Sequence, residues 1–263
     1  MKAELIVFAS KQLKEYLRSP SSLFWTMGWP IFWVLITIYV FLAGVPEPAL
    51  PYVRGSVTVS MIAFGLATVG MVGLASSIAQ DRDSGLYLKL SSMSISSWGE
   101  VLGRILGSLI YGTVTLLAIL AIGVAVGSKF EASTPNVIAS LPFFAVLLLS
   151  ASGIGLIISN LVKGRAVEGI AVALLVGGCS VSGVFAPYAS LPDYLRLFSK
   201  LYPISASMHV INRLLLVKGF AWMHYDFDPS SPLYMAYTLA VSMGLFVAGI
   251  LFHRAMARKR ALQ

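Results

Sequence analysis

The chain has 263 residues, of which 57% are hydrophobic and only 11% are charged. Soluble globular domains contain about 45–50% apolar and about 25% charged residues, so this composition excludes an ordinary soluble enzyme and a disordered chain. The net charge of +8 indicates lysines and arginines beside anionic lipid rather than a nucleic-acid partner. A single cysteine excludes a disulfide framework.

Six uncharged stretches are each long enough to cross a bilayer, whose hydrocarbon core takes about 20 helical residues. They are continuous apolar runs rather than alternating ones, so helices are the expected spanning form. The sequence therefore predicts an all-α membrane protein with one transmembrane domain over 1–263. Its six transmembrane helices are expected at 22–44, 56–79, 104–127, 137–160, 168–186 and 232–253.

The basic residues predict the orientation of these spans. Thirteen of the 19 lysines and arginines fall on one side of the predicted membrane, in 1–18, 81–104, 163–168 and 253–263. Because basic segments stay in the cytoplasm, we expect a multi-pass protein of the cell membrane with both termini cytoplasmic.

Residues 1–19 form the first predicted element, an amphipathic helix. Its apolar and its charged side chains repeat at helical spacing on different faces: Leu5, Phe8, Leu13 and Leu17 against Lys11, Lys14, Glu15 and Arg18. We expect it to lie in the cytoplasmic interface and to end before Pro20.

Three tryptophans, Trp25, Trp29 and Trp33, follow at i, i+4 and i+8 on the first span. Such a stripe favours a surface that faces lipid or a second subunit, and a platform for substrate is the alternative.

A longer polar loop with its own apolar positions joins the second and third spans. These positions need something to pack against, which is either the bilayer interface or a partner protein. Gly99, Gly103 and Gly107 follow at four-residue spacing, which lets helices approach closely within one subunit or between two.

The segment 188–218 carries apolar residues at helical spacing that Pro203 interrupts. It is too short to span twice, so we expect two short helices, re-entrant or capping, at the outer end of the bundle.

The chain lacks the motifs of several catalytic classes. It has no GxxxxGK[ST] loop for ATP and no HExxH or GxSxG motif. The six uncharged stretches hold no carboxylate, which argues against an ion-coupled carrier. We therefore expect no enzyme activity, no metal and no cofactor in this chain, and an energy source outside it.

Two sets of residues carry a resemblance to a known family. The first is an acidic–basic–acidic triplet followed by spaced glycines, a leucine and a Glu–Arg pair: Asp81, Arg82, Asp83, Gly85, Leu90, Glu100, Gly103 and Arg104. The second lies after the fifth span: Gly183, Phe185, Pro187, Leu191, Pro192, Tyr202 and Pro203. With the basic N-terminal helix, this order resembles the type-2 ATP-binding-cassette (ABC) permease family.

The resemblance implies a transport mechanism. Two copies of this chain, or this chain and a homologous permease, would form the pore, and two copies of a separate ABC ATPase would bind ATP and Mg²⁺. Residues 83–98 resemble the coupling helix that contacts the ATPase. The implied coupling residues are Asp81, Arg82, Asp83, Gly85, Leu88, Lys89, Leu90, Met93 and Ile95.

In related exporters the second and fifth spans line the substrate path. Here they would offer Phe64, Thr68, Met71, Leu175, Cys179 and Ser182. An uncharged lining suits a hydrophobic or amphipathic cargo such as a drug or lipid, although these side chains also fit simple helix packing. Two alternatives are an exporter of lipid-linked polysaccharide and an ATP-independent carrier or channel.

Overall fold

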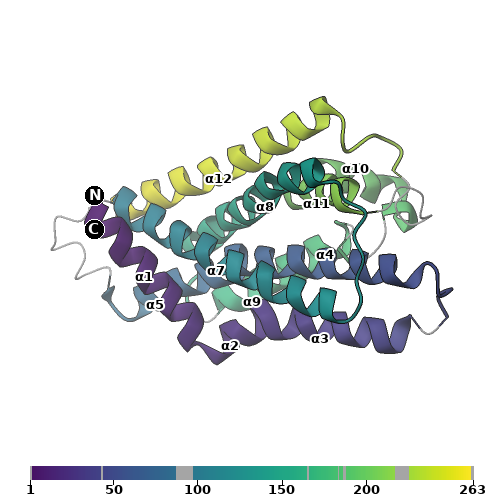
Figure 1. The fold of residues 1–263 in the computed structure, drawn as a ribbon. Helices are drawn as coiled ribbons and strands as arrows, with labels where there is room; N and C mark the ends of the chain where they lie inside the picture. Colours follow the sequence, from purple (N-terminus) through teal and green to yellow (C-terminus); the bar gives the residue numbers. More distant parts are fainter. Residues whose placement is uncertain are drawn as a thin grey trace.

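The computed structural model describes residues 2–42, 44–86, 97–164, 166–182, 184–185, 188–216 and 225–261, which fold into helices, turns and short connections without a β-strand. The long helices run side by side along one axis (Figure 1). The chain begins in α1 and finishes in α12 at the same end of this bundle, and α10 and α11 lie at the other end (Figure 1).

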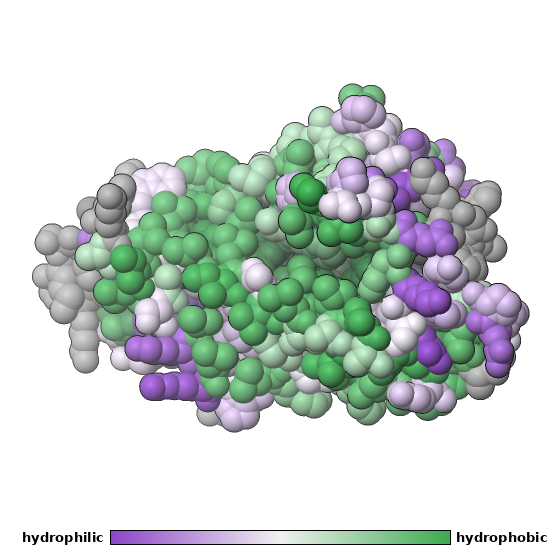
Figure 2. Space-filling model, in the orientation of Figure 1, coloured by the Kyte–Doolittle hydropathy of each residue, from purple (hydrophilic) through white to green (hydrophobic). Residues whose placement is uncertain are grey.

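The surface of the bundle fits a membrane. Figure 2 shows hydrophobic residues over the middle of the molecule and hydrophilic residues gathered toward its two ends. Among the described residues, five helical stretches are long and apolar enough to cross a bilayer: Pro20–Phe41, Leu50–Asp83, Trp98–Ala125, Thr134–Leu161 and Pro232–Met256. The prediction of an all-α chain with several membrane-length helices is confirmed in this coarser form.

The N-terminal helix α1, Lys2–Arg18, is separate from the first long stretch. Ser19 begins the next helix, because its hydroxyl accepts a hydrogen bond from Ser22 N at 3.2 Å and Pro20 follows at the first helical position. The stretch then continues as α2 (Pro20–Leu23), η1 (Phe24–Gly28), α3 (Trp29–Ile36) and η2 (Thr37–Phe41), where η1 and η2 are π-helical turns.

The second long stretch is the central helix of the bundle. It consists of α4 (Leu50–Thr68), the π-helical turn η3 (Val69–Gly73) and α5 (Leu74–Asp83). Neighbouring elements bury 89% of its most apolar part, whereas the corresponding part of Pro20–Phe41 is 22% buried. The central helix is thus enclosed by protein, and the first stretch leaves most of its surface for lipid or another chain.

Helices α7 (Ser97–Ala125), α8 (Thr134–Leu161) and α12 (Pro232–Ala261) complete the set of long helices. Helices α8 and α12 cross at two glycines: a Cβ atom added to Gly249 would lie 2.4 Å from the carbonyl oxygen of Gly153. Only glycines allow this approach of two backbones, which is the usual function of small residues between membrane helices.

The predicted fifth span, 168–186, is a shorter helix in the structure. Helix α9 covers Ala166–Ser180, 15 residues, which correspond to about 22 Å of helix against a hydrocarbon core of about 30 Å. It ends because the backbone turns, with Phe185 N donating to Cys179 O at 3.4 Å. The chain then forms η4 (Tyr188–Ser190), α10 (Asp193–Leu201) and α11 (Pro203–Leu215). Whether α9 crosses the membrane, and whether α10 and α11 enter it, stay predictions.

Candidate functional site

The acidic–basic–acidic triplet lies at the end of α5, where the central helix leaves the bundle. Gly85 has a φ of +71°, a left-handed conformation that favours glycine and commonly ends a helix. Gly85 N donates to Arg82 O at 3.1 Å, and Ser84 Oγ donates to Asp81 O at 3.0 Å. The triplet therefore sets the point at which the chain turns out of α5 toward residues 87–96.

Asp81 is buried, with 6% of its surface exposed. Its Oδ2 accepts a hydrogen bond from Lys11 Nζ of α1 at 2.6 Å and another from Arg104 Nη2 of α7. Asp81 thus joins α5 to α1 and α7. The contact with an ATPase that the resemblance implies for it stays a prediction.

Arg104 is the centre of the same cluster and is only 1% exposed. Besides Asp81, its guanidinium donates to Glu100 Oε1 at 3.2 Å and to Ser77 Oγ at 2.8 Å. Ser77 Oγ also lies 2.6 Å from Glu15 Oε2 and 2.9 Å from Gln12 Oε1, both of α1. Buried charges are tolerated when they are paired and hydrogen-bonded in this manner. We call Lys11, Gln12, Glu15, Ser77, Asp81, Glu100 and Arg104 the ion cluster.

Arg82 points to another helix. Its Nη1 and Nη2 atoms donate to the carbonyl oxygens of Ser159, at 2.7 Å, and Val162, at 3.0 Å. These carbonyls close the C-terminal end of α8, where helical carbonyls lack intrahelical partners and favour a cation. Arg82 thus ties α5 to α8, whereas Asp83 is exposed and lies 3.9 Å from Arg82.

The three spaced glycines pack α7 against α1 within one subunit. A Cβ atom on Gly103 would lie 2.7 Å from Phe8 Cβ, and one on Gly107 would lie 2.6 Å from Ala9 O. Farther along α1, the Tyr16 hydroxyl donates to Val69 O in η3 at 2.8 Å. Together with the ion cluster, these contacts join α1 to η3 and to α5.

The remaining predicted coupling residues, Leu88, Lys89, Leu90, Met93 and Ile95, lie outside the described residues, as does the middle of the predicted coupling helix 83–98. Lys11, Gln12, Glu15 and Ser77 were missed as members of a site. The available signal was the i, i+4 spacing of Ser77 with Asp81 and of Glu100 with Arg104, which places each pair on one helical face.

Three of the six predicted path residues line one cavity. Phe64, Thr68 and Leu175 surround a volume of about 310 Å³ together with Trp25, Trp29, Trp33, Val172, Val176 and Phe185. The other three, Met71, Cys179 and Ser182, are equally buried but are not among the residues that line this volume. We call this volume the tryptophan cavity.

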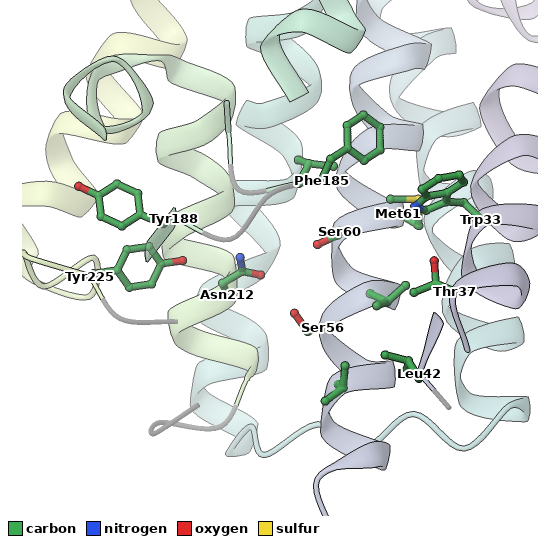
Figure 3. Close-up of a pocket in the computed structure, with 13 residues that line it drawn as sticks. Trp33, Thr37, Leu42, Ser56, Ser60, Met61, Phe185, Tyr188, Asn212 and Tyr225 are labelled. Carbon is green, nitrogen blue, oxygen red and sulfur yellow. The ribbon is translucent and has the colours of Figure 1, made fainter. Parts of the chain in front are cut away.

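A second cavity of about 290 Å³ adjoins the tryptophan cavity, because Trp33 and Phe185 line both. It lies between α4 and α11, and Figure 3 shows Ser56 and Ser60 on one side and Asn212 on the other. The sequence gave no indication of this second volume, which we call the outer cavity.

Charged residues beside the outer cavity pair with one another. Asp226 accepts hydrogen bonds from Tyr188 Oη at 2.6 Å and from Lys200 Nζ at 2.8 Å. Burial raises the pKa of Asp226, but the two hydrogen bonds and the Lys200 charge outweigh burial and hold this pKa below its ordinary value of 3.8. Within the described ranges, no three His, Cys, Asp or Glu side chains come together as metal ligands would.

A family model described as ABC-2 type transporter matches residues 3–216. The match covers α1 from its second residue, the ion cluster, the tryptophan cavity, all of α11 and every wall residue of the outer cavity except Tyr225. It is the family that the sequence motifs suggested. A search of curated proteins gave no match. Since the matched residues make up well over half of the chain, the protein belongs to the ABC-2 type transporter family and is a membrane permease subunit of an ABC transporter.

Proposed function

We propose that this chain is the permease subunit of an ATP-driven exporter in the cell membrane, with both termini cytoplasmic. Two permease chains form the pathway, and two copies of a separate ATPase bind ATP and Mg²⁺ and contact residues 83–98. The cargo is a hydrophobic or amphipathic molecule such as a drug or lipid.

The ion cluster is the observation that carries this proposal. Residues 87–96 follow directly from α5, and Asp81 at the end of α5 is joined to α1 and α7 by buried charged hydrogen bonds. A force applied to the loop therefore reaches three helices at once rather than bending one. Such a link is useful only if the ATPase binds the two permease states with different affinity, because a ligand shifts an equilibrium by its differential affinity.

The tryptophan cavity supports the cargo class. Neither its aliphatic nor its aromatic lining residues carry a charge, and Thr68 supplies the one hydroxyl group. An apolar or amphipathic molecule loses no ionic hydration on entering such a volume, whereas an ion would do so without a counter-charge.

The same cavity also supports a second candidate function, which is export of a lipid-linked polysaccharide. The rings of Trp25 and Trp29 lie 5.7 Å apart and those of Trp29 and Trp33 lie 6.0 Å apart. They form a ladder of aromatic faces, and together with Phe64 they line the cavity. The expected stripe facing lipid or a second subunit is thus also a wall of a volume inside one chain.

Coupling is tested with the permease and its ATPase reconstituted together in liposomes. Replacing Leu88 and Leu90 by aspartate removes apolar contact surface from the loop, and we expect transport and transport-stimulated ATP hydrolysis to be lost. The matched control is Ser91→Asp with Ser92→Asp, which adds two carboxylates to the same loop and keeps both leucines. Unchanged coupling in the leucine variant would remove this loop from the mechanism.

Orientation is tested separately with a cysteine placed in the C-terminal tail of a Cys179→Ser chain. A membrane-impermeant thiol reagent added outside intact cells should leave this tail unlabelled. Labelling before lysis would reverse the proposed orientation.

A further inference from the structure

The outer cavity has a polar lining that the tryptophan cavity lacks. Thr37 from η2, Ser56 and Ser60 from α4, and Asn212 from α11 all contribute to its wall. Figure 3 shows the Asn212 carbonyl oxygen and the two serine hydroxyls directed into the space between α4 and α11. Three separate segments of the chain therefore place hydrogen-bonding groups around one volume.

Two of these groups are buried without a partner. Among the described residues, no donor lies within hydrogen-bonding distance of Asn212 Oδ1, and Thr37 Oγ1 likewise has no hydrogen-bond partner. Asn212 is only 6% exposed, and its amide also approaches the Tyr225 hydroxyl. Buried polar atoms are nearly always satisfied, because leaving one unpaired destabilises the fold. Two such atoms in the wall of one cavity point to a ligand that supplies the missing hydrogen bonds.

The rest of the wall is aromatic or aliphatic and contains no Asp, Glu, Lys or Arg. Charged groups beside the cavity are paired: Asp226 with Lys200, and Arg213, which acts on Tyr225, with Asp228. The Tyr188 hydroxyl donates to Asp226 and is turned away from the cavity (Figure 3). A charged ligand would lose its hydration here and gain no counter-charge.

We propose that the outer cavity is a binding site for an uncharged molecule that carries hydroxyl groups on a compact ring skeleton. The hydroxyls bond to Asn212, Thr37, Ser56 and Ser60, and the apolar faces of the ring pack against Trp33 and the neighbouring aromatic side chains. Volumes of about 300 Å³ are at the small end of ligand pockets, which suits a single ring.

The shared wall connects this site to transport. Trp33 and Phe185 border both cavities, with ring centroids 6.4 Å apart. An amphipathic cargo places its hydroxylated part in the outer cavity and its apolar part in the tryptophan cavity. This use of the site for cargo rests on the proposed function, whereas binding itself is a property of the permease chain alone.

The test measures binding to the full-length permease in lipid nanodiscs by calorimetry, with no ATPase present. The probe is p-nitrophenyl β-D-glucoside. Two compounds of similar shape are compared with it: the glucuronide, which adds a carboxylate, and p-nitroanisole, which lacks the hydroxylated ring. We expect the glucoside to bind at least about tenfold more tightly than either. A glucuronide or anisole affinity within twofold of the glucoside, or no binding of the glucoside, would overturn the proposal.

Variants separate a ligand site from a structural role. Thr37→Val keeps the shape of the side chain and removes an unpaired hydroxyl, so affinity should fall about 3–10-fold, while the melting temperature of the free protein stays equal or rises. Asn212→Leu should weaken binding in the same way. Ser180→Ala is the control, because Ser180 is exposed, bonds to Val176 O at 2.8 Å and lines neither cavity.

Wild-type affinity in both Thr37→Val and Asn212→Leu refutes the assignment. The binding test involves no ATPase, so its outcome is independent of the coupling test. If the glucoside binds but the Leu88/Leu90 variant remains coupled, only the proposed function is contradicted. If the variant loses coupling but the glucoside does not bind, only this inference is contradicted.

Discussion

Replacing Arg104 by methionine tests whether the ion cluster holds three helices together. Methionine keeps most of the volume but removes a charge that is 1% exposed and pairs with Asp81 and Glu100. In the variant Asp81 and Glu100 both lose their contact with Arg104, while Lys11 still pairs with Asp81 and Glu15. Breaking a buried ion pair by removing one partner costs about 3–5 kcal/mol.

The only cysteine in the chain provides the assay. Cys179 is 1% exposed, so a thiol-reactive fluorophore labels it when the bundle unfolds. A chain of this size loses about 2–4 °C in melting temperature per kcal/mol, and Arg104→Met should therefore melt about 6–20 °C below the wild type. Arg18→Met is the matched control, since Arg18 is exposed on α1, and its melting temperature should change by less than about 2 °C.

A double variant tests the cause of the loss. Asp81→Asn removes one of the carboxylates that Arg104 balances, so Asp81→Asn with Arg104→Met should cost clearly less than the sum of the two single variants. An Arg104→Met chain that melts like the control, or a double variant that is strictly additive, would show that the cluster is not a buried, coupled unit.

Three further changes probe other contacts. Gly103→Ala should lower the melting temperature, because the added Cβ has no room against α1. The control Gly177→Ala should be neutral or stabilising, since nothing lies within 4 Å of its added Cβ. A Gly103→Ala chain as stable as Gly177→Ala would contradict the close packing. Arg82→Leu should speed amide hydrogen exchange at the end of α8, and unchanged protection there would contradict the tie. The lowered pKa of Asp226 means that its stabilising contribution is present above about pH 4 and is lost as the pH falls through the folded value. The rate of trypsin cleavage at Lys200 in Asp226→Asn, divided by the wild-type rate at the same pH to remove the pH dependence of trypsin itself, should therefore exceed one and stay constant between pH 5 and 8.

The spacing of charges predicted most of the fold. Five uncharged runs correspond to long helices because a membrane helix must exclude charge along its whole length. The fifth uncharged run, residues 169–192, extends well past the end of helix α9 at Ser180. Absence of charge indicates where a chain can enter lipid, but it does not indicate where the backbone turns. That turn depends on hydrogen bonds such as Phe185 N to Cys179 O, which hydrophobicity does not reveal.

The candidate site was predictable only where its residues are close in the chain. The motif contained Asp81 and Arg104, but their partner Lys11 is 70 residues before Asp81, and no local pattern links the two. The outer cavity was missed for the same reason, since Thr37, Ser60 and Asn212 come from three distant segments. Spacing alone does not say which of the predicted path residues border a cavity, because one helical face can point to a cavity or to a neighbouring helix.

The ion cluster gives two basic residues different tasks at different times. In the orientation that we propose, Lys11 and Arg104 count during insertion among the positive charges that keep their segments in the cytoplasm, and acidic neighbours weaken this effect little. After folding, the same charges are neutralised by Asp81, Glu15 and Glu100. The end of the bundle that holds the ion cluster is thus less basic than its sequence, because charges that count toward the proposed orientation also join helices α1, α5 and α7.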